Sequence, residues 1–278
     1  MRPHWKVFLT GAALWAATVV VTVVTANSNL IPTIVLLGSF LVPVTFVVWA
    51  YEHGRDNVVT VELLFKCFVI GGVLGVLGAS VLESYLGQSL WMYFAVGLIE
   101  EGVKVAALLL VARGIVKNRL RDGAVLGATV GFGFASFESA GYAFNALFTD
   151  DGLSLIQMVE TEILRGVLAP VGHGLWSAIL GAVLFSQGGR LTARFLLAYL
   201  GVSLLHGLWD SMSGLAVAIT LILTGKQWQF HQLELGELPG VTDAQTHLYT
   251  ILNWGGLALI SIIAIFCLSR LLKKPVSP

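Results

Sequence analysis

Charged residues are scarce in this sequence: Asp, Glu, Lys and Arg together make up 12% of its 278 residues, while 56% are hydrophobic. Soluble domains carry about 25% charged residues, roughly twice this share. The mean hydropathy of +0.85 agrees with this shortage. The composition therefore excludes an ordinary soluble protein and predicts an all-α polytopic membrane protein, of which nearly all lies in the bilayer.

Net charge and cysteine are also lacking. The sequence has 16 basic and 16 acidic residues, so no charge excess indicates a nucleic-acid partner. Its only two cysteines, Cys67 and Cys267, lie within apolar runs. They are typical of small hydrophobic side chains and indicate neither a disulfide nor a thiolate metal site.

Eight apolar segments are present, and each is long enough to cross the hydrocarbon core, which takes about 20 helical residues. We predict a single transmembrane domain over residues 1–278, with about eight helices in contact with lipid. Arg2 and Lys6 open the first segment, and no convincing cleavage site follows, which favours a retained span over a signal peptide. The segments cover about 5–26, 30–51, 61–82, 91–113, 123–148, 160–186, 193–223 and 247–270.

Basic residues predict the orientation. Lys66 and Lys104 lie inside predicted spans, and only Arg165 and Lys226 fall on the side opposite the termini. The other twelve lie on the side of the termini: Arg2, Lys6, Arg55, Arg113, Lys117, Arg119, Arg121, Arg190, Arg194, Arg270, Lys273 and Lys274. Because Lys and Arg accumulate in cytoplasmic loops, both termini are predicted to be cytoplasmic, in the cell membrane of a bacterium or archaeon.

The segment 91–113 carries three charges in its middle: Glu100, Glu101 and Lys104. A charge at that depth costs at least about 2.5–3.5 kcal/mol on insertion scales. Glu100 and Lys104 are four residues apart and share a helix face, so they can pair. One such pair would suffice to fix helix packing, and the additional Glu101 favours a functional site.

The next three segments carry polar residues at a similar depth. Glu138 lies in the first of them, His173 in the second, and His206 with Asp210 in the third. At about 1.5 Å per residue all of these lie in the central third of the bilayer. Converging faces would form a polar site at mid-membrane. Asp210, four residues after His206, can share a metal with it or orient its imidazole.

Two local patterns accompany these residues. The tetrapeptide His-Gly-Leu-Trp occurs at 173–176 and again at 206–209, for which an old duplication and a parallel chemical demand are equally good explanations. Gly123, Gly127 and Gly131 recur every fourth residue, and Gly71 and Gly75 do the same. Small residues at this spacing predict close helix packing in lipid.

Two kinds of chemistry suit such a site. A buried carboxylate can take a proton from water and return it to a leaving amine, and histidines with a carboxylate can hold zinc beside an activated water. Hydrolysis is therefore favoured. Intramembrane Glu, Lys and His also serve proton or cation transport.

The order of the motifs resembles the PrsW family of intramembrane proteases, which is grouped with the CAAX-processing membrane proteases. The motifs are EExxK at 100–104, FxxxE at 134–138, His173, and HGLWD at 206–210, so the catalytic core that the resemblance implies covers about 91–220. The resemblance implies hydrolysis of a peptide bond in or near a membrane-anchored protein substrate.

The resemblance also implies roles. Glu100 or Glu101 matches the general base for the water, and the wider group favours Glu100. Glu138 stands where CAAX-type relatives have a histidine, as a metal ligand or a second acid/base, and Lys104 would balance charge. The implied catalytic set is Glu100, Glu101, Lys104, Glu138, His173, His206 and Asp210.

The implied metal ligands are Glu138, His173, His206 and Asp210, with zinc as the candidate ion. A metal-free glutamate mechanism is equally compatible with the residues. Two further functions stay open: a non-catalytic membrane scaffold or receptor, and a proton-coupled transporter. Burying the Glu and His side chains costs desolvation energy, and a pure scaffold has no reason to bear that cost, which argues against the scaffold. The lack of a clear two-half repeat with broken helices argues mildly against the transporter.

Overall fold

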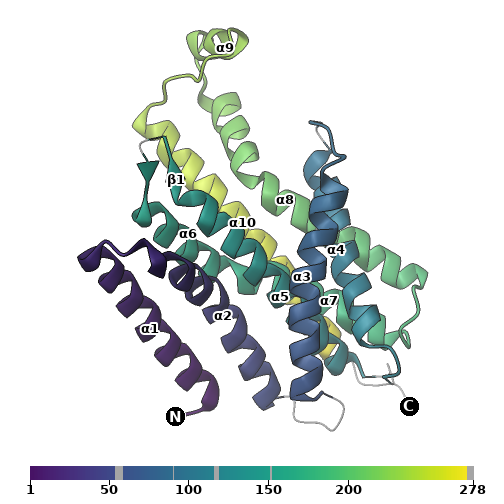
Figure 1. The fold of residues 1–278 in the computed structure, drawn as a ribbon. Helices are drawn as coiled ribbons and strands as arrows, with labels where there is room; N and C mark the ends of the chain where they lie inside the picture. Colours follow the sequence, from purple (N-terminus) through teal and green to yellow (C-terminus); the bar gives the residue numbers. More distant parts are fainter. Residues whose placement is uncertain (54–58, 90, 116–118, 151, 274–278) are drawn as a thin grey trace.

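The computed structural model describes residues 1–53, 59–89, 91–115, 119–150 and 152–273. These residues are almost entirely helical, which confirms the all-α prediction (Figure 1). A short antiparallel pair, β1 (Phe148–Thr149) and β2 (Gly152–Leu153), joins two helices. The helices are α1 (Pro3–Thr25), α2 (Ile31–His53), α3 (Val61–Glu83), α4 (Met92–Val111), α5 (Leu120–Ala146), α6 (Leu155–Leu168), α7 (His173–Ser186), α8 (Ala193–Thr224), α9 (Gln227–Glu234) and α10 (Asp243–Leu272).

Seven of the eight predicted segments form one main helix each in the described chain, and the eighth, 160–186, is divided into two. Six stretches are long and apolar enough to cross a membrane, as expected for an integral membrane protein: Pro3–Thr25, Ser28–Glu52, Val61–Glu83, Leu155–Ser186, Ala193–Thr224 and Asp243–Leu272. The two predicted spans outside this set are α4, which contains three charged residues, and the glycine-rich α5. The total of eight therefore stays a prediction.

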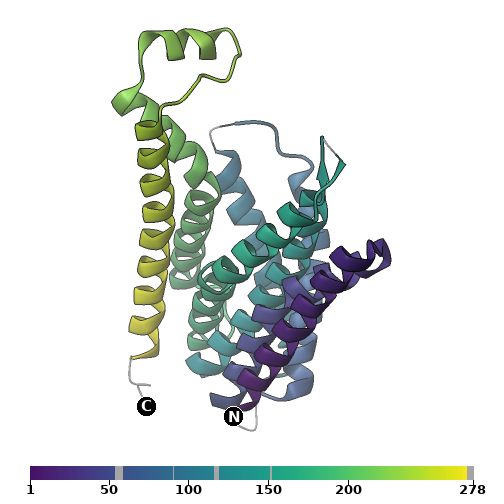
Figure 2. The ribbon, with the colours of Figure 1, turned by 90° about the vertical axis from the view of Figure 1, so that its left-hand side faces the viewer.

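The start of α1 and the end of α10 lie at the same end of the bundle (Figures 1 and 2). This agrees with an even number of crossings. Which end faces the cytoplasm stays a prediction. Three of the basic residues that support it, Arg55, Lys117 and Lys274, lie outside the described residues.

The predicted segment 160–186 forms two helices, so a single continuous helix is wrong. α6 ends at Leu168, a 3₁₀ turn covers Ala169–Val171, and α7 begins at His173. Pro170 has no N–H to continue the helical hydrogen bonds. Gly172, with φ −104° and ψ −114°, leaves the helical region. His173 was expected near the middle of a helix and is instead the first residue of α7.

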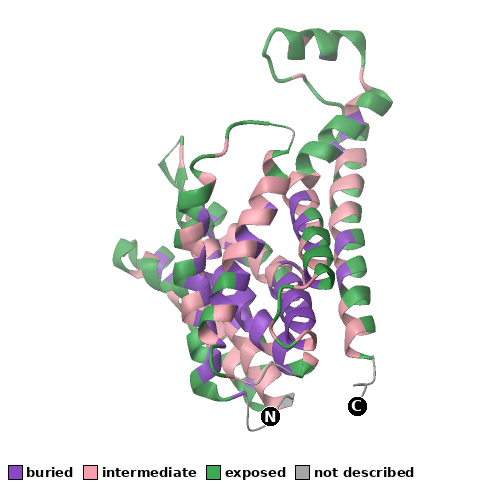
Figure 3. Ribbon diagram, turned by 90° about the vertical axis from the view of Figure 1, so that its right-hand side faces the viewer, coloured by how far each residue is buried: buried purple, intermediate pink, exposed green. Residues whose placement is uncertain are grey.

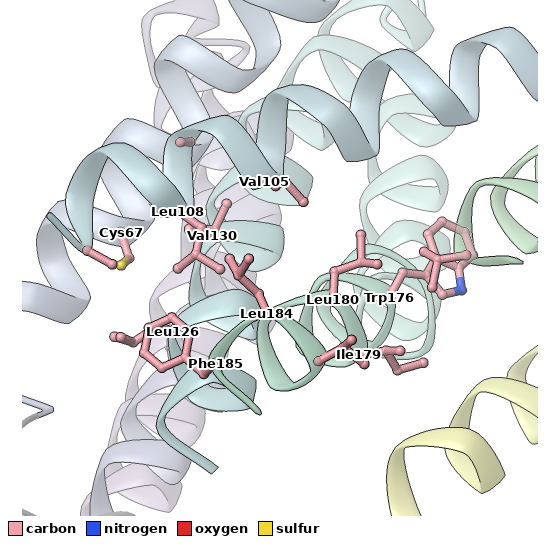
Figure 4. Packing of buried hydrophobic residues seen from close by; sticks show 14 of the residues in the cluster. Cys67, Val105, Leu108, Leu126, Val130, Trp176, Ile179, Leu180, Leu184 and Phe185 are labelled. Atoms are coloured by element: carbon pink, nitrogen blue, oxygen red, sulfur yellow. The ribbon is translucent and has the colours of Figure 1, made fainter. Parts of the chain in front are cut away.

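Glycines bring α5 and α7 into close contact, as their spacing predicts. A Cβ at Gly127 would lie 2.2 Å from the carbonyl oxygen of Ser177, and one at Gly131 would lie 2.3 Å from that of His173. Apolar side chains of α4, α5 and α7 pack around this contact (Figure 4). Buried residues gather in the middle of the bundle, whereas α10 is mostly exposed or half-buried (Figure 3).

Gly127→Ala is expected to lower the free energy of unfolding by about 1–3 kcal/mol, the usual effect of overpacking. The added methyl group would force α5 away from α7. Gly141→Ala on the same helix is the matched control, because an added Cβ there meets nothing within 4 Å. Thermal unfolding in detergent, followed by tryptophan fluorescence, measures both. Equal Tm values for the two variants would contradict close α5–α7 packing.

α9 lies beyond the end of α8 and the start of α10 (Figure 1). Gln229 of α9 and Gln245 of α10 are buried and exchange two amide hydrogen bonds of 3.1 and 3.0 Å. These bonds fix α9 to the bundle. Trp228 and Phe230 are exposed, as side chains at headgroup level would be.

Candidate active site

The charged residues of α4 form a buried cluster. Glu100, Glu101 and Lys104 are all buried. The Lys104 Nζ donates hydrogen bonds to Glu100 Oε2 at 3.2 Å and to Glu101 Oε1 at 2.8 Å. The predicted pairing of Glu100 with Lys104 is confirmed, and one ammonium serves two carboxylates.

α8 carries His206 into this cluster. Its Nδ1 lies 3.0 Å from Glu101 Oε1, and its Nε2 lies 3.6 Å from Glu100 Oε2. The same Nε2 lies 3.3 Å from Asp210 Oδ2, one turn along α8. Carboxylates only accept hydrogen bonds, so Glu101 holds a proton on Nδ1. The Nε2 atom then faces the carboxylates of Glu100 and Asp210. A proton or a cation is needed between Nε2 and these two carboxylates.

His173 reaches the cluster from the start of α7. Its Nε2 lies 3.0 Å from Glu138 Oε2, and its Nδ1 lies 2.8 Å from Lys104 Nζ and 3.8 Å from Glu100 Oε2. Glu138 accepts from the Nε2 side and Lys104 donates to Nδ1. The two contacts fix the ring, with the Nδ1 lone pair directed toward Lys104 and Glu100 Oε2 close to the same nitrogen.

Arg165 is a residue of the site that the sequence analysis did not select. It was assigned to the side of the membrane opposite the termini. In the structure its guanidinium donates to Glu138 Oε2 and, at 2.8 Å, to Ser139 Oγ. It also stacks over the Tyr142 ring at 4.2 Å. Its position inside an apolar segment was the available signal, since such a cation needs a partner.

The repeated tetrapeptide makes parallel contacts in its two copies. Both histidines belong to the cluster. A Cβ at Gly174 would lie 2.5 Å from the Phe132 ring, and one at Gly207 would lie 2.9 Å from the Tyr93 carbonyl oxygen. Each copy thus supplies an imidazole to the cluster and a glycine at a close contact with a neighbouring helix.

The tryptophans of the two copies also meet. The Trp176 ring lies 4.4 Å from the His206 ring, and Trp209 packs edge-on against Trp176 at 5.6 Å. The Trp176 ring covers one face of His206, and Trp209 supports Trp176. The two rings restrict the rotation of His206 and keep its surroundings apolar.

One group of His, Cys, Asp and Glu in the described chain has the spacing of a metal site. Glu100, His173 and His206 each offer a donor atom, and these atoms lie within 4.8 Å of one another. Two imidazoles and one carboxylate form a donor set of catalytic zinc sites. In each histidine the other ring nitrogen faces a carboxylate, which is the usual orienting contact. The residues therefore fit a metal ion.

Two contacts bear on that fit. Lys104 Nζ lies 2.8 Å from His173 Nδ1, so the ammonium and an ion would compete for the same lone pair. Glu138 and Asp210, both predicted as ligands, lie next to the two histidines. Their role as ligands stays a prediction.

A cavity of about 460 Å³ leads to the cluster between α3, α4, α5 and α8. Glu100, Glu138 and Asp210 line it at mid-helix, whereas Glu83 and Tyr93 line it at the end of α3 and the start of α4. It therefore reaches toward the end of the bundle opposite the start of α1 (Figure 1). Glu101 is not among the lining residues. Glu83 was not singled out in the sequence.

The sequence matches the model of the PrsW family intramembrane metalloproteases over residues 59–230. No curated protein and no solved structure matches the chain. The match contains the whole predicted core, 91–220. It also includes α3, for which the motifs gave no signal, and α3 is the helix that supplies one wall of the cavity.

Proposed function

The chain belongs to the PrsW family of intramembrane metalloproteases, and we propose that it hydrolyses a peptide bond of a membrane-anchored protein at the cluster of Glu100, His173 and His206. The observation that carries this proposal is their convergence. Three different helices bring one carboxylate and two oriented imidazoles within 4.8 Å of one another, beside a cavity that can admit water and an extended peptide.

Glu100, His173 and His206 would hold the metal ion, and two imidazoles with one carboxylate suit zinc. When bound, the ion supplies polarisation of the scissile carbonyl and a water that ionises near neutral pH. Glu101 and Glu138 hold the two histidines in orientation through contacts of 3.0 Å each. Arg165 in turn holds Glu138.

The carboxylates divide into orienting and proton-carrying groups. Glu101 is completely buried and does not line the cavity, so it is suited to orient His206. Asp210 lines the cavity and is 3.3 Å from His206 Nε2. It can accept a proton from the attacking water and return it to the leaving amine. Glu100 is the member of the EE pair that faces the cavity.

Mapping of protein termini in cells tests the proposal without a known substrate. Cells that express the wild type should contain new N-termini within or beside the membrane spans of one or a few membrane proteins. Cells with His206→Ala, at the same expression level, should lack them. A wild-type pattern identical to that of His206→Ala would contradict protease activity.

Metal content tests the ligand assignment. Purified wild type is expected to hold near one zinc per chain by elemental analysis, and Glu100→Gln and His206→Ala should lose it. Asp210→Asn is the matched control and should keep it, because Asp210 lies outside the proposed ligand set. Loss of zinc in Asp210→Asn with retention in Glu100→Gln would reverse the assignment.

The broken helix supports a second candidate, a proton-coupled transporter. Discontinuous helices with a functional residue at the break are typical of transporters, and His173 lies at such a break. This candidate predicts proton flux in liposomes that stops in Glu138→Gln. Flux without peptide cleavage would replace the protease proposal.

A further inference from the structure

A second concave surface lies on α7, α8 and α10. It is a groove of about 540 Å³ that shares only α8 with the active-site cavity. Its walls are mostly apolar and include Val183 of α7, Ala198 and Leu205 of α8, and Ile263 and Phe266 of α10. In a membrane protein such a groove contacts lipid. The charged residues that line it therefore indicate which lipid headgroup it selects.

Two arginines lie at one end of this groove. Arg194 is in the first turn of α8 and Arg270 is in the last turn of α10. Both are exposed and both line the groove, and the Arg270 guanidinium lies 5.0 Å from the Phe266 ring. None of the described lining residues is acidic. The apolar groove therefore ends at two cationic side chains.

The length of the groove matches one leaflet of a bilayer. From Arg194 to Leu205 the α8 helix rises about 16 Å, and half of the hydrocarbon core is about 15 Å. Arg194 opens α8 at the end of the bundle where α10 finishes, and Leu205 precedes His206 of the mid-membrane site. The groove thus extends from headgroup level to the bilayer centre, on the side of the termini.

We propose that this groove binds one anionic phospholipid. The phosphate lies between Arg194 and Arg270, and one acyl chain lies along α8 and α10. Guanidinium groups pair well with phosphate oxygens, and basic sites between helices near the membrane surface select anionic headgroups. A zwitterionic headgroup brings its own cation and gains less from the same arginines.

The arginine pair favours a phospholipid over a substrate helix as occupant. A phosphate with an attached acyl chain matches both the cationic end of the groove and its apolar walls. The bound chain would brace Val202 and Leu205 on the helix that carries His206. Occupancy should therefore raise thermal stability.

Native mass spectrometry of delipidated protein tests the proposal. Wild type titrated with phosphatidylglycerol should retain one lipid, and Arg194→Gln/Arg270→Gln should need at least tenfold more lipid for equal occupancy. Lys6→Gln/Arg113→Gln is the control, because it removes two exposed cations outside the groove lining and should bind like the wild type. Phosphatidylcholine with the same acyl chains should bind the wild type more weakly.

Thermal unfolding provides a second readout. Phosphatidylglycerol should raise the Tm of the wild type and of the control, but not of the arginine variant. Glycerol phosphate, which has no acyl chains, should have no effect at equal concentration. The proposal is overturned by equal phosphatidylglycerol binding in the arginine variant, by equal binding of the two lipids, by protection from glycerol phosphate alone, or by a peptide retained in place of lipid.

Discussion

Glu100→Gln is expected to reduce peptide-bond hydrolysis by about 10²–10⁴-fold, the range associated with loss of an acid–base or metal-binding group at a reacting centre. Glu100 lines the cavity, and its Oε2 lies 3.6 and 3.8 Å from the two histidines. An amide keeps the size of the side chain but loses its charge. Lys104 still pairs with Glu101, so the fold should persist.

The measurement is turnover of a substrate found by terminus mapping, in liposomes that contain the purified variant. Glu101→Gln is the informative comparison, because its amide oxygen can still accept from His206 Nδ1 and Lys104. It should lose clearly less activity than Glu100→Gln. Glu62→Gln, on the exposed start of α3, should be unchanged. A larger loss in Glu101→Gln than in Glu100→Gln would assign the main role to Glu101.

The helices could be predicted because the bilayer imposes a length and excludes charge. Runs of about 20 apolar residues have few alternatives in such a chain. The same constraint made the site predictable. Glu138, His173 and His206 fall at the predicted mid-membrane depth, where polar side chains must find one another. The structure brings these three residues into contact with the α4 cluster, or with one another.

The rotation of α4 could not be predicted. Glu100 and Glu101 are adjacent in sequence and point about 100° apart on the helix. Which of them faces the cavity depends on how α4 packs against α3 and α8. Local sequence patterns do not indicate how α4 packs against these two helices. The structure places Glu100 on the cavity and Glu101 behind His206.

The break between α6 and α7 was also missed, for a related reason. Apolar residues continue through 169–171, and proline is tolerated in membrane helices when neighbouring groups satisfy the backbone. Pro170 alone therefore gave an ambiguous signal. The break aligns Arg165 with Glu138 and places His173 at a helix start. The contacts of Arg165 and His173 with Glu138 link residues more than 25 positions apart, beyond the reach of local patterns.

Lys104→Met is expected to lower the free energy of unfolding by about 3–5 kcal/mol, because removal of one partner leaves buried charges without compensation. The lysine is buried and contacts both Glu100 and Glu101. Lys66→Met is the matched control. Lys66 forms an i,i+4 pair with Glu62 on an exposed surface, where water screens the charges, so its loss should change stability little.

Zinc should distinguish the two lysine variants further. Lys104 Nζ contacts the His173 nitrogen that an ion would need, so methionine removes a competitor as well as a counter-charge. At a given concentration, a ligand that binds only the folded state stabilises it more when it binds more tightly. Zinc should therefore raise the Tm of Lys104→Met more than that of the wild type. The zinc-induced Tm shift of Lys66→Met should equal that of the wild type.

If Lys104→Met is as stable as Lys66→Met without zinc, the carboxylates of Glu100 and Glu101 are not both charged in the folded protein. If it is unstable but indifferent to zinc, Glu100, His173 and His206 do not hold the ion, and the lysine is the only cation that their arrangement requires.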